Sequence, residues 1–388
     1  LRYMVEHQFK YHPPTYGNLE HYILEGLIDF GMLLPEPEYI HRAVRWHNAV
    51  IVTQFFADGF WHEGTPAYHK DIWQGVAVLV PRLLKGYSDP PGFRSVETYE
   101  WIQARPEVQG APGITIVDGA ARFDDLDLEA IYGVQFRRME EAVNKLLFPD
   151  RTVAGLHDCL LQGYQAWWAQ APTVGEPRLL GSSGHGILGT GTHRDQVYVH
   201  LHYGGTHGHE HYDALNIILW AKNLELISEG MYRPLPGDIS TREWHTSTAA
   251  HNTVVIDERD QGGRFSNRTR RITALDAVSG IPDWRYRSGG HGNSDSDGRL
   301  LMFETTFDNV QVIEASGEKS YYTVQPDIYR RTLALVKIDA RDCYVVDIFR
   351  VKGGGIHDWM LHGPLDVPYE MTLSDPMQPK EGVLHKYL

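Results

Sequence analysis

Apolar residues recur at helical spacing through the first part of the chain. In NLEHYILEGLIDFGMLL, for example, Tyr22, Ile23, Leu27 and Phe30 lie on one face of a helix. Four further segments show the same period: PEYIHRAVRWHNAVIVTQFF, YHKDIWQGVAVLVPRLLKGY, DLEAIYGVQFRRMEEAVNKLLF and LHDCLLQGYQAWWAQA. Glycines and prolines separate these segments. The pattern predicts stacked helical hairpins up to about residue 172.

The period changes after APTVGEP, residues 171–177. The segments that follow alternate polar and apolar residues, contain many β-branched residues and are joined by short turns, as in VYVHLHYGG, NTVVIDE and YRRTLALVKIDARDCYVVDIFRVKGG. These features predict an antiparallel sheet assembly. We therefore expect a helical domain over residues 1–175 and a sheet domain over residues 176–388. Because the chain starts at Leu1 in what reads as the middle of a helix, we expect N-terminal residues to be missing.

Composition narrows the class of protein. A net charge of −14 argues against a nucleic-acid binder, which is normally basic. Cys159 and Cys343 each lie in an apolar run, so we expect buried free thiols and no disulfide framework. No apolar run approaches the roughly 18 residues of a membrane span, and no signal peptide is visible.

The stretch THGHEHYDAL, Thr206–Leu215, concentrates histidine. If the backbone is extended here, the side chains of His209 and His211 point to one face, about 7 Å apart. They would then share a site, on one metal ion or on a metal and a substrate. His251, directly before a strand, and Glu229, at a strand end, are candidates for a further ligand. Spacing alone leaves three alternatives open: a metal site, an acid–base centre or a histidine-rich loop without function.

Three motifs together resemble the heparinase II/III-like polysaccharide lyases. HGHEHYDALNIILWAKNLELISEG is similar to the histidine–aspartate strand motif of that family. STAAHNTVVIDERDQ is similar to its second signature, a His-Asn-Thr run. FFADGFWHEGTPAYHKDIW, Phe55–Trp73, resembles a segment of its helical domain. The resemblance implies an α+β multidomain fold, in which an incomplete (α/α) toroid precedes an antiparallel β-sandwich.

The resemblance also implies β-elimination on a glycan that contains uronic acid. This reaction needs a group that neutralises the carboxylate, a base for the C5 proton and an acid for the leaving oxygen. Tyr68 matches the catalytic tyrosine of the family, which would act as the base. His209 matches its active-site histidine and is the alternative or partner base. Asn18 lies near the position of an amide or imidazole that contacts the substrate carboxylate. His21 and His69 are further candidates for substrate contact.

The resemblance assigns a metal ion to His211 and His251. The acidic ligand of the family usually lies two residues before a glycine, where this chain has Ser228, and the acid is one residue later, at Glu229. A shift of one residue turns a strand side chain to the opposite face. Either the strand end bulges so that Glu229 reaches the metal, or the site is altered or empty. We expect a structural divalent ion, with zinc first and manganese or calcium second.

The expected partner is an anionic polysaccharide, and we expect no nucleic acid and no membrane span. Arginine forks bind carboxylate and sulfate groups well, and Arg242 and Arg264 are the first candidates. Glycosaminoglycans are the preferred substrates and alginate is the alternative. A metal-dependent hydrolase and an inactive carbohydrate-binding protein remain as other classes. By resemblance alone, we expect a bacterial protein that is secreted or periplasmic. The pattern predicts no oligomeric state.

Overall fold

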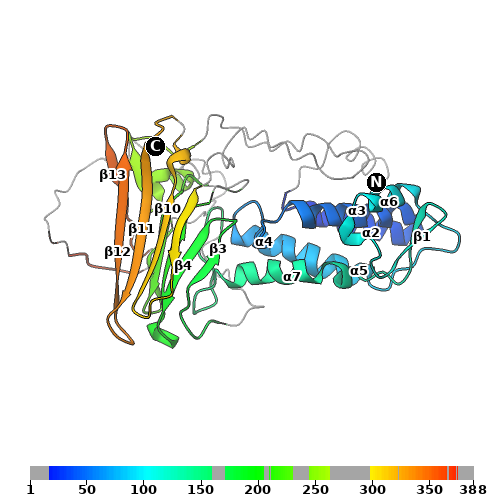
Figure 1. Ribbon diagram of the computed structural model, residues 1–388, viewed down its shortest axis with the longest axis horizontal. Coiled ribbons are helices and arrows are strands. Elements are labelled where there is room, and N and C mark those ends of the chain that lie inside the picture. The colour runs from blue at the N-terminus through cyan, green and yellow to red at the C-terminus, as the bar shows by residue number, and fades with distance from the viewer. Residues whose placement is uncertain are drawn as a thin grey trace. The chain divides into compact units, whose positions relative to one another are not determined.

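The computed structural model describes residues 17–159, 171–204, 209, 211–229, 244–262, 298–321, 323–364, 367–372 and 374. Its contacts divide into two compact units. The helical unit contains the described residues up to His62 and those of Tyr68–Glu141. The sheet unit contains Glu63–Ala67 and the described residues from Ala142 onward. Figure 1 shows helices early in the chain and strands late in it, as the sequence predicts. The domain boundary near residue 175 remains a prediction.

The helices of the first part follow the predicted segments closely. They are α2 (Glu20–Leu33), α3 (Pro37–Thr53), α4 (Pro66–Trp73), a π-helix (Gln74–Leu79), α5 (Val80–Leu84), α6 (Val96–Gln103), a 3-10 turn (Pro106–Val108) and α7 (Leu128–Asn144). Leu24, Ile28 and Val44 are among the fully buried residues of their shared core. None of the helices in the described ranges is long and apolar enough to cross a bilayer.

Three features of this part depart from the predicted pattern. The prediction missed α6, whose N-cap Ser95 accepts a hydrogen bond from the Thr98 amide. It also missed the hairpin of β1 (Ile114–Val117) and β2 (Ala120–Phe123). The helix predicted from LHDCLLQ onward is wrong at its start, since residues 156–159 have no helical structure. The rest of that segment lies outside the described residues.

The sheet unit is built from antiparallel strands. One sheet has the order β3-β4-β5-β6-β7, a second has the order β12-β11-β10-β9, and β8 pairs with β13. The strands are β3 (Arg178–Leu180), β4 (His185–Thr190), β5 (Val197–His202), β6 (Asn216–Ala221), β7 (Leu224–Ile227), β8 (Val254–Ile256), β9 (Arg299–Glu304), β10 (Val310–Ser316), β11 (Ile328–Lys337), β12 (Cys343–Lys352) and β13 (His357–Trp359). Three short 3-10 turns accompany them, at His193–Asp195, Thr248–Ala250 and Glu318–Ser320. Helices followed by antiparallel sheets confirm the coarser part of the predicted fold class.

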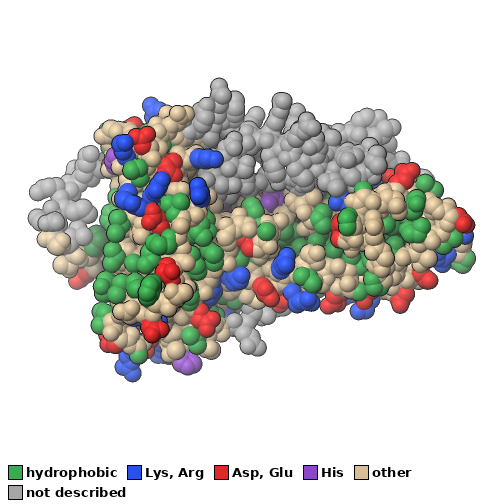
Figure 2. Space-filling model, viewed as in Figure 1, with side chains coloured by type: hydrophobic (Ala, Val, Ile, Leu, Met, Phe, Trp, Pro, Cys, Tyr) green, Lys and Arg blue, Asp and Glu red, His purple; other side chains and the backbone are tan. Residues whose placement is uncertain are grey.

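One hydrophobic core draws on both larger sheets, with Val199 and Ile217 from the first and Ile313 and Leu333 from the second. The strand β12 is less buried than this core, because its residues alternate between half-buried and exposed. Tyr344 and Ile348 are among its exposed apolar residues, and Figure 2 shows hydrophobic side chains gathered on this part of the surface.

A buried arginine joins the second sheet to the backbone just before β6 and just before β8. Arg331 of β11 forms a two-point ion pair with Asp347 of β12, with nitrogen–oxygen distances of 2.9 and 2.5 Å. Its Nη1 also donates to the carbonyl oxygens of Leu215 and Asn252. Since the charge is paired and its donors are used, burial is tolerated. Arg331 therefore fixes the backbone on which the histidine-rich site is built.

Candidate functional site

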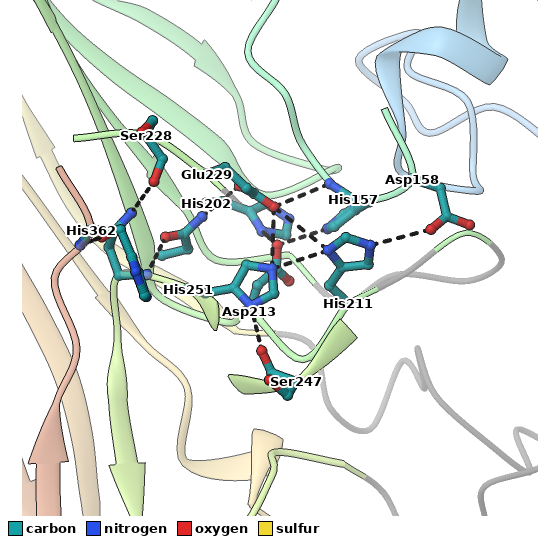
Figure 3. Close-up of polar contacts among 12 residues, drawn as sticks. His157, Asp158, His202, His211, Asp213, Ser228, Glu229, Ser247, His251 and His362 are labelled. Atoms are coloured by element: carbon teal, nitrogen blue, oxygen red, sulfur yellow. Dashed lines mark hydrogen bonds and ion pairs between the residues drawn. The ribbon is translucent and has the colours of Figure 1, made fainter. Parts of the chain in front are cut away.

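Three buried side chains converge in the sheet unit: His211 before β6, Glu229 after β7 and His251 before β8. Figure 3 shows them pointing toward one another. His211 Nδ1 lies 3.1 Å from His251 Nε2. Glu229 Oε1 lies 3.4 Å from His251 Nε2 and 3.9 Å from His211 Nδ1. These are the residues that the sequence predicts as metal ligands, and the fold brings all three together.

The contacts behind this triad fix the proton positions on both imidazoles. His211 Nε2 lies 3.2 Å from Asp158 Oδ1 and donates to it. His251 Nδ1 lies 2.7 Å from the carbonyl oxygen of Ser247 and donates there. Each neutral ring then presents a lone pair on its other nitrogen. Two lone pairs and a carboxylate oxygen therefore face one another, and this arrangement needs a positive centre between them.

A proton and a metal ion are the two possible positive centres. Burial lowers the pKa of His211, against the hydrogen bond to Asp158. Burial also lowers the pKa of His251, but the hydrogen bond and charge of Glu229 outweigh it, so the net pKa is raised. A divalent ion would meet all three atoms at once, whereas one proton joins only two. Two imidazoles and a carboxylate are a donor set that zinc accepts.

The backbone explains how Glu229 reaches the triad although Ser228 holds the expected position. Trp220 pairs with Glu225 and Leu219 pairs with Ile227, so β7 has one extra residue, Leu226, at this point. Such a β-bulge bends the strand and turns its side chains. Glu229 also lies beyond the last residue of β7, where strand alternation no longer applies. Of the two alternatives that the sequence left open, the bulge is the one observed.

Further hydrogen bonds hold the Glu229 carboxylate in place. Its Oε2 accepts from Asn216 Nδ2 at 2.7 Å, and its Oε1 accepts from the His157 amide at 3.2 Å. Asn216 in turn accepts from the Asn252 amide at 2.9 Å. The hydroxyl of Ser228 donates elsewhere, to the carbonyl oxygen of Gly363 at 2.6 Å. The triad thus contains Glu229 as its acidic member, and Ser228 lies outside it.

A second arrangement, an aspartate–histidine dyad, begins at Asp158. Its Oδ2 accepts from His209 Nδ1 at 2.9 Å, while its Oδ1 accepts from His211. Burial raises the pKa of Asp158, but the hydrogen bonds from both histidines outweigh it and hold that pKa well below its usual range. Donation from Nδ1 makes Nε2 the basic nitrogen of His209. With 27% of its side chain exposed, His209 is the solvent-accessible member of this group.

In the helical unit, Tyr68 and Asn18 are both half-buried. Tyr68 is half-buried in the first turn of α4 and packs against the core. Asn18 is half-buried before α2. The N-cap of α2 is Leu19, and no side chain caps this helix, so Asn18 does not serve as a helix cap.

His69 and His21 have structural surroundings. His69 is fully buried, accepts from the Trp61 amide at 2.8 Å and donates to the Met139 carbonyl at 2.8 Å. Both of its ring nitrogens serve the main chain, which favours a structural role over the substrate contact that the sequence suggested. The His21 ring is 5% exposed, and a side chain at Gly75 would collide with it. Arg242 and Arg264 lie outside the described residues.

Comparison with known proteins gives a family match for a long segment of the sheet unit. Residues 196–374 match the family model described as heparinase II/III-like, C-terminal. This part of the chain is a heparinase II/III-like domain. The resemblance drawn from the histidine motifs is therefore confirmed. The heparinase II/III-like domain includes His209, His211, Glu229 and His251, whereas Asp158, Tyr68 and Asn18 precede it.

Solved structures extend the similarity in fold to most of the chain. A crystal structure of heparinase III matches with a TM-score of 0.54 and 14% identity, covering 87% of this chain and 47% of the other. Heparan sulfate lyase HepC from Pedobacter heparinus matches with a TM-score of 0.51 and 15% identity, covering 87% and 46%. The chain spans about half the length of these proteins. No curated protein sequence matches it.

Sequence reasoning missed Asp158 as a site residue. It lies in the segment that the apolar pattern assigned to a helix, and a single aspartate there carries no signal of its own. The only available hint was the adjacent pair His157-Asp158, two chemistry-bearing residues in an otherwise apolar run. The fold brings this pair to histidines that lie more than fifty residues further along.

Proposed function

We propose that this chain is a polysaccharide lyase that cleaves uronic-acid glycosaminoglycans by β-elimination. One observation supports the proposal most strongly: the Asp158–His209 dyad adjoins the buried His211–Glu229–His251 triad in a heparinase II/III-like domain. The names of the similar structures, heparinase III and heparan sulfate lyase, favour a sulfated glycosaminoglycan over alginate. In the proposed fold, the helices form part of an incomplete (α/α) toroid and the sheets form a β-sandwich.

In the proposed reaction, His209 Nε2 removes the proton from C5 of the uronic acid. The electron pair of that C–H bond forms the C4–C5 double bond, and the C4–oxygen bond breaks with its electrons leaving on oxygen. A proton donor then neutralises the leaving oxygen. Asp158 stabilises the imidazolium that forms on His209 and keeps Nε2 directed to the substrate. A base held in this way contributes about 10²–10⁴-fold to the rate.

We propose a structural role for the metal site. His211, Glu229 and His251 would hold the ion, with zinc preferred over manganese and calcium because two of the three donors are imidazoles. When bound, the ion supplies charge neutralisation for Glu229 and fixes the ring of His211. Since His211 shares the Asp158 carboxylate with His209, its position sets the orientation of the base.

The remaining assignments rest on motif resemblance and, for the two arginines, on the affinity of the guanidinium group for carboxylate and sulfate. Tyr68 is proposed to donate the proton to the leaving oxygen or to share the role of base. Asn18 is proposed to bind the substrate carboxylate through its amide, and Arg242 and Arg264 to bind the anionic chain. A secreted or periplasmic location, and alginate as the alternative substrate, are proposals of the same kind.

Burial argues against the metal-dependent hydrolase. A catalytic ion keeps an open position for water or substrate. His211 is 5% exposed, and Glu229 and His251 are 0% exposed, so the triad resembles a closed structural site. Activity assays separate the lyase from the hydrolase and from a binding protein without activity.

The test incubates the full chain with heparan sulfate, chondroitin, hyaluronan and alginate and follows far-ultraviolet absorbance from the C4–C5 double bond. The proposal expects absorbance to rise on at least one glycosaminoglycan and His209→Gln to abolish the rise. The matched control is His193→Gln, because His193 is exposed in a turn of the same unit. If no unsaturated product forms on any of the four substrates, the lyase proposal is wrong.

A further inference from the structure

A second group of potential ligands lies beside the first. His157 Nε2 is 3.1 Å from Asp213 Oδ2, and His202 Nδ1 is 3.3 Å from the same oxygen. The three residues are 0%, 1% and 2% exposed, in the order His157, His202, Asp213. Their donor atoms all lie within 4.8 Å of one another. The β-elimination proposed above assigns no chemical step to this group. Burying the carboxylate of Asp213 is nevertheless costly unless an opposite charge or hydrogen bonds compensate it.

Separate elements hold the three side chains in place. His202 ends β5, Asp213 precedes β6, and His157 lies in the loop after α7. The ring of His202 stacks on that of His185, its cross-strand partner in β4, with centroids 4.7 Å apart and an angle of 23°. Gly184 makes this pairing possible, since its φ is +86° and a side chain there would collide with the backbone of Gly204. The cluster is thus anchored on a sheet and two loops.

The proton positions again leave a lone pair facing a carboxylate. His157 Nδ1 lies 3.0 Å from the carbonyl oxygen of Gly64 and donates to it. In the neutral ring, Nε2 then directs its lone pair at Asp213 Oδ2. His157 and His202 thus each direct a ring nitrogen at the same oxygen of Asp213, at 3.1 and 3.3 Å. Two imidazole nitrogens that converge on one buried carboxylate oxygen have the arrangement of ligands around a cation.

The distances also match a coordination sphere. Zinc binds imidazole nitrogen and carboxylate oxygen at about 2.0–2.1 Å, so two ligand atoms of a tetrahedral site lie about 3.3 Å apart. The two nitrogen–oxygen distances in this cluster, 3.1 and 3.3 Å, are close to that edge length. The first triad, with edges of 3.1 to 3.9 Å, fits the same ion less closely.

We infer that His157, His202 and Asp213 form a second metal site, which takes a zinc-class divalent cation and is separate from the His211–Glu229–His251 site. Figure 3 shows the two groups side by side, joined at His157. The His157 ring lies 6.0 Å from that of His211, and its amide donates to Glu229. An ion here fixes the loop that carries Asp158, and therefore the partner of His209. The inference needs no lyase activity.

The test counts metal ions in the full chain without an affinity tag, loaded with zinc and dialysed against buffer, by elemental mass spectrometry. Two ions per chain are expected for the wild type. One is expected for His202→Asn, one for Glu229→Gln and none for the double variant. His193→Asn removes an exposed imidazole and is expected to keep two, which controls for adventitious surface binding.

Two results would overturn the inference. One is a wild type with a single ion and a His202→Asn variant that keeps it. The other is anomalous diffraction at the zinc edge from wild-type crystals with a peak at His211–Glu229–His251 and none at His157–His202–Asp213. The diffraction experiment needs no variant, so a folding defect in His202→Asn cannot hide the answer. A protein that holds two ions but gives no unsaturated product would refute the lyase proposal and leave this site standing.

Discussion

Most buried histidines have different partners in the two units. His41 of the helical unit is an exception, because its Nε2 lies 2.9 Å from the buried carboxylate of Asp89. In the helical unit, His47 donates to the Val76 carbonyl at 2.7 Å, and His69 exchanges hydrogen bonds with two main-chain groups. Each of these two rings hydrogen-bonds to main-chain atoms, without a second imidazole or a carboxylate. In the sheet unit, by contrast, buried imidazoles face other imidazoles and carboxylates, as His211 does with His251 and Asp158.

This difference separates structural histidines from candidate functional ones. A neutral imidazole whose N–H donates to a carbonyl oxygen carries no charge, so it does not require a bound ion. Imidazoles that converge on a carboxylate leave lone pairs and charge that need an ion or a proton. Burial alone therefore does not mark a site, since His69 and His251 are both 0% exposed. The partners of the ring nitrogens make the distinction.

The largest expected effect tests the solvent-accessible histidine of the sheet unit. Replacing His209 with Gln removes the base and should lower kcat by about a thousandfold, with little change in the free energy of unfolding. His69→Gln in the helical unit should do the reverse, with reduced stability and near-normal kcat. Steady-state kinetics and urea unfolding of both variants check the contrast. Full activity in the His209 variant would contradict the assignment.

The next effect concerns the converging ligands. Glu229→Gln should release the ion from the first triad and lower the free energy of unfolding by about 4 kcal/mol, when the free ion is at about a thousand times its dissociation constant. A chelator should reproduce the loss in the wild type and add less in the variant. Thermal unfolding with and without zinc measures this.

Ser228→Ala is the matched control for Glu229→Gln. It removes only the hydrogen bond to Gly363 and should cost about 1 kcal/mol, independently of zinc. A zinc-dependent loss in the Ser228 variant, with none in the Glu229 variant, would show that Glu229 is not the ligand.

A smaller effect is expected at the residue that joins base and triad. Asp158→Asn keeps the size of the side chain but removes the charge that stabilises the imidazolium and fixes the ring proton of His209. We expect kcat to fall about a hundredfold while KM changes little. Asp308→Asn, at an exposed position of the same unit, should leave both constants unchanged. A fall in both variants would point to a general effect of charge.

The smallest effect is a pH dependence in the helical unit. Burial lowers the pKa of His47 and His69 to about 4, against main-chain hydrogen bonds that raise it. Between the unfolded pKa of 6.5 and this value, the unfolded chain binds more protons, so stability falls as the pH falls. Each histidine should cost about 2 kcal/mol between pH 7 and pH 5.

Urea unfolding at the two pH values measures this loss. His69→Gln should lose its share of the dependence, and His193→Gln, which changes an exposed ring, should not. An unchanged pH dependence in the His69 variant would show that other groups cause it.

Much of the fold followed from periodicity, and much of the site did not. The apolar period placed α2, α3 and α7, and alternation placed the pairs β6–β7 and β11–β12, because burial of one face imposes a repeat on the sequence. The period placed the helix α2 but not its buried face, since Tyr22 is 59% exposed whereas Leu24 and Ile28 are buried. Motifs predicted His209, His211 and His251 as site residues. The position of Glu229 depended on one extra residue in β7, which no pattern reveals.

Residues that lie far apart in sequence were the hardest to predict. Asp158 and His157 belong to a loop that reads as a helix, and His202 reads as an ordinary strand residue. Their role depends on which atoms the fold brings within about 3 Å of one another. That information comes from packing between distant segments and not from local spacing.

The most direct test of β-elimination follows oxygen into the product. Wild-type protein is incubated with heparan sulfate in water enriched in heavy oxygen, and the new chain ends are weighed by mass spectrometry. The account predicts fragments that are lighter by one water than hydrolysis products, with an unsaturated end and no heavy oxygen, and none of them with His209→Gln. Saturated fragments that each carry one heavy oxygen would contradict it, because they would show hydrolysis.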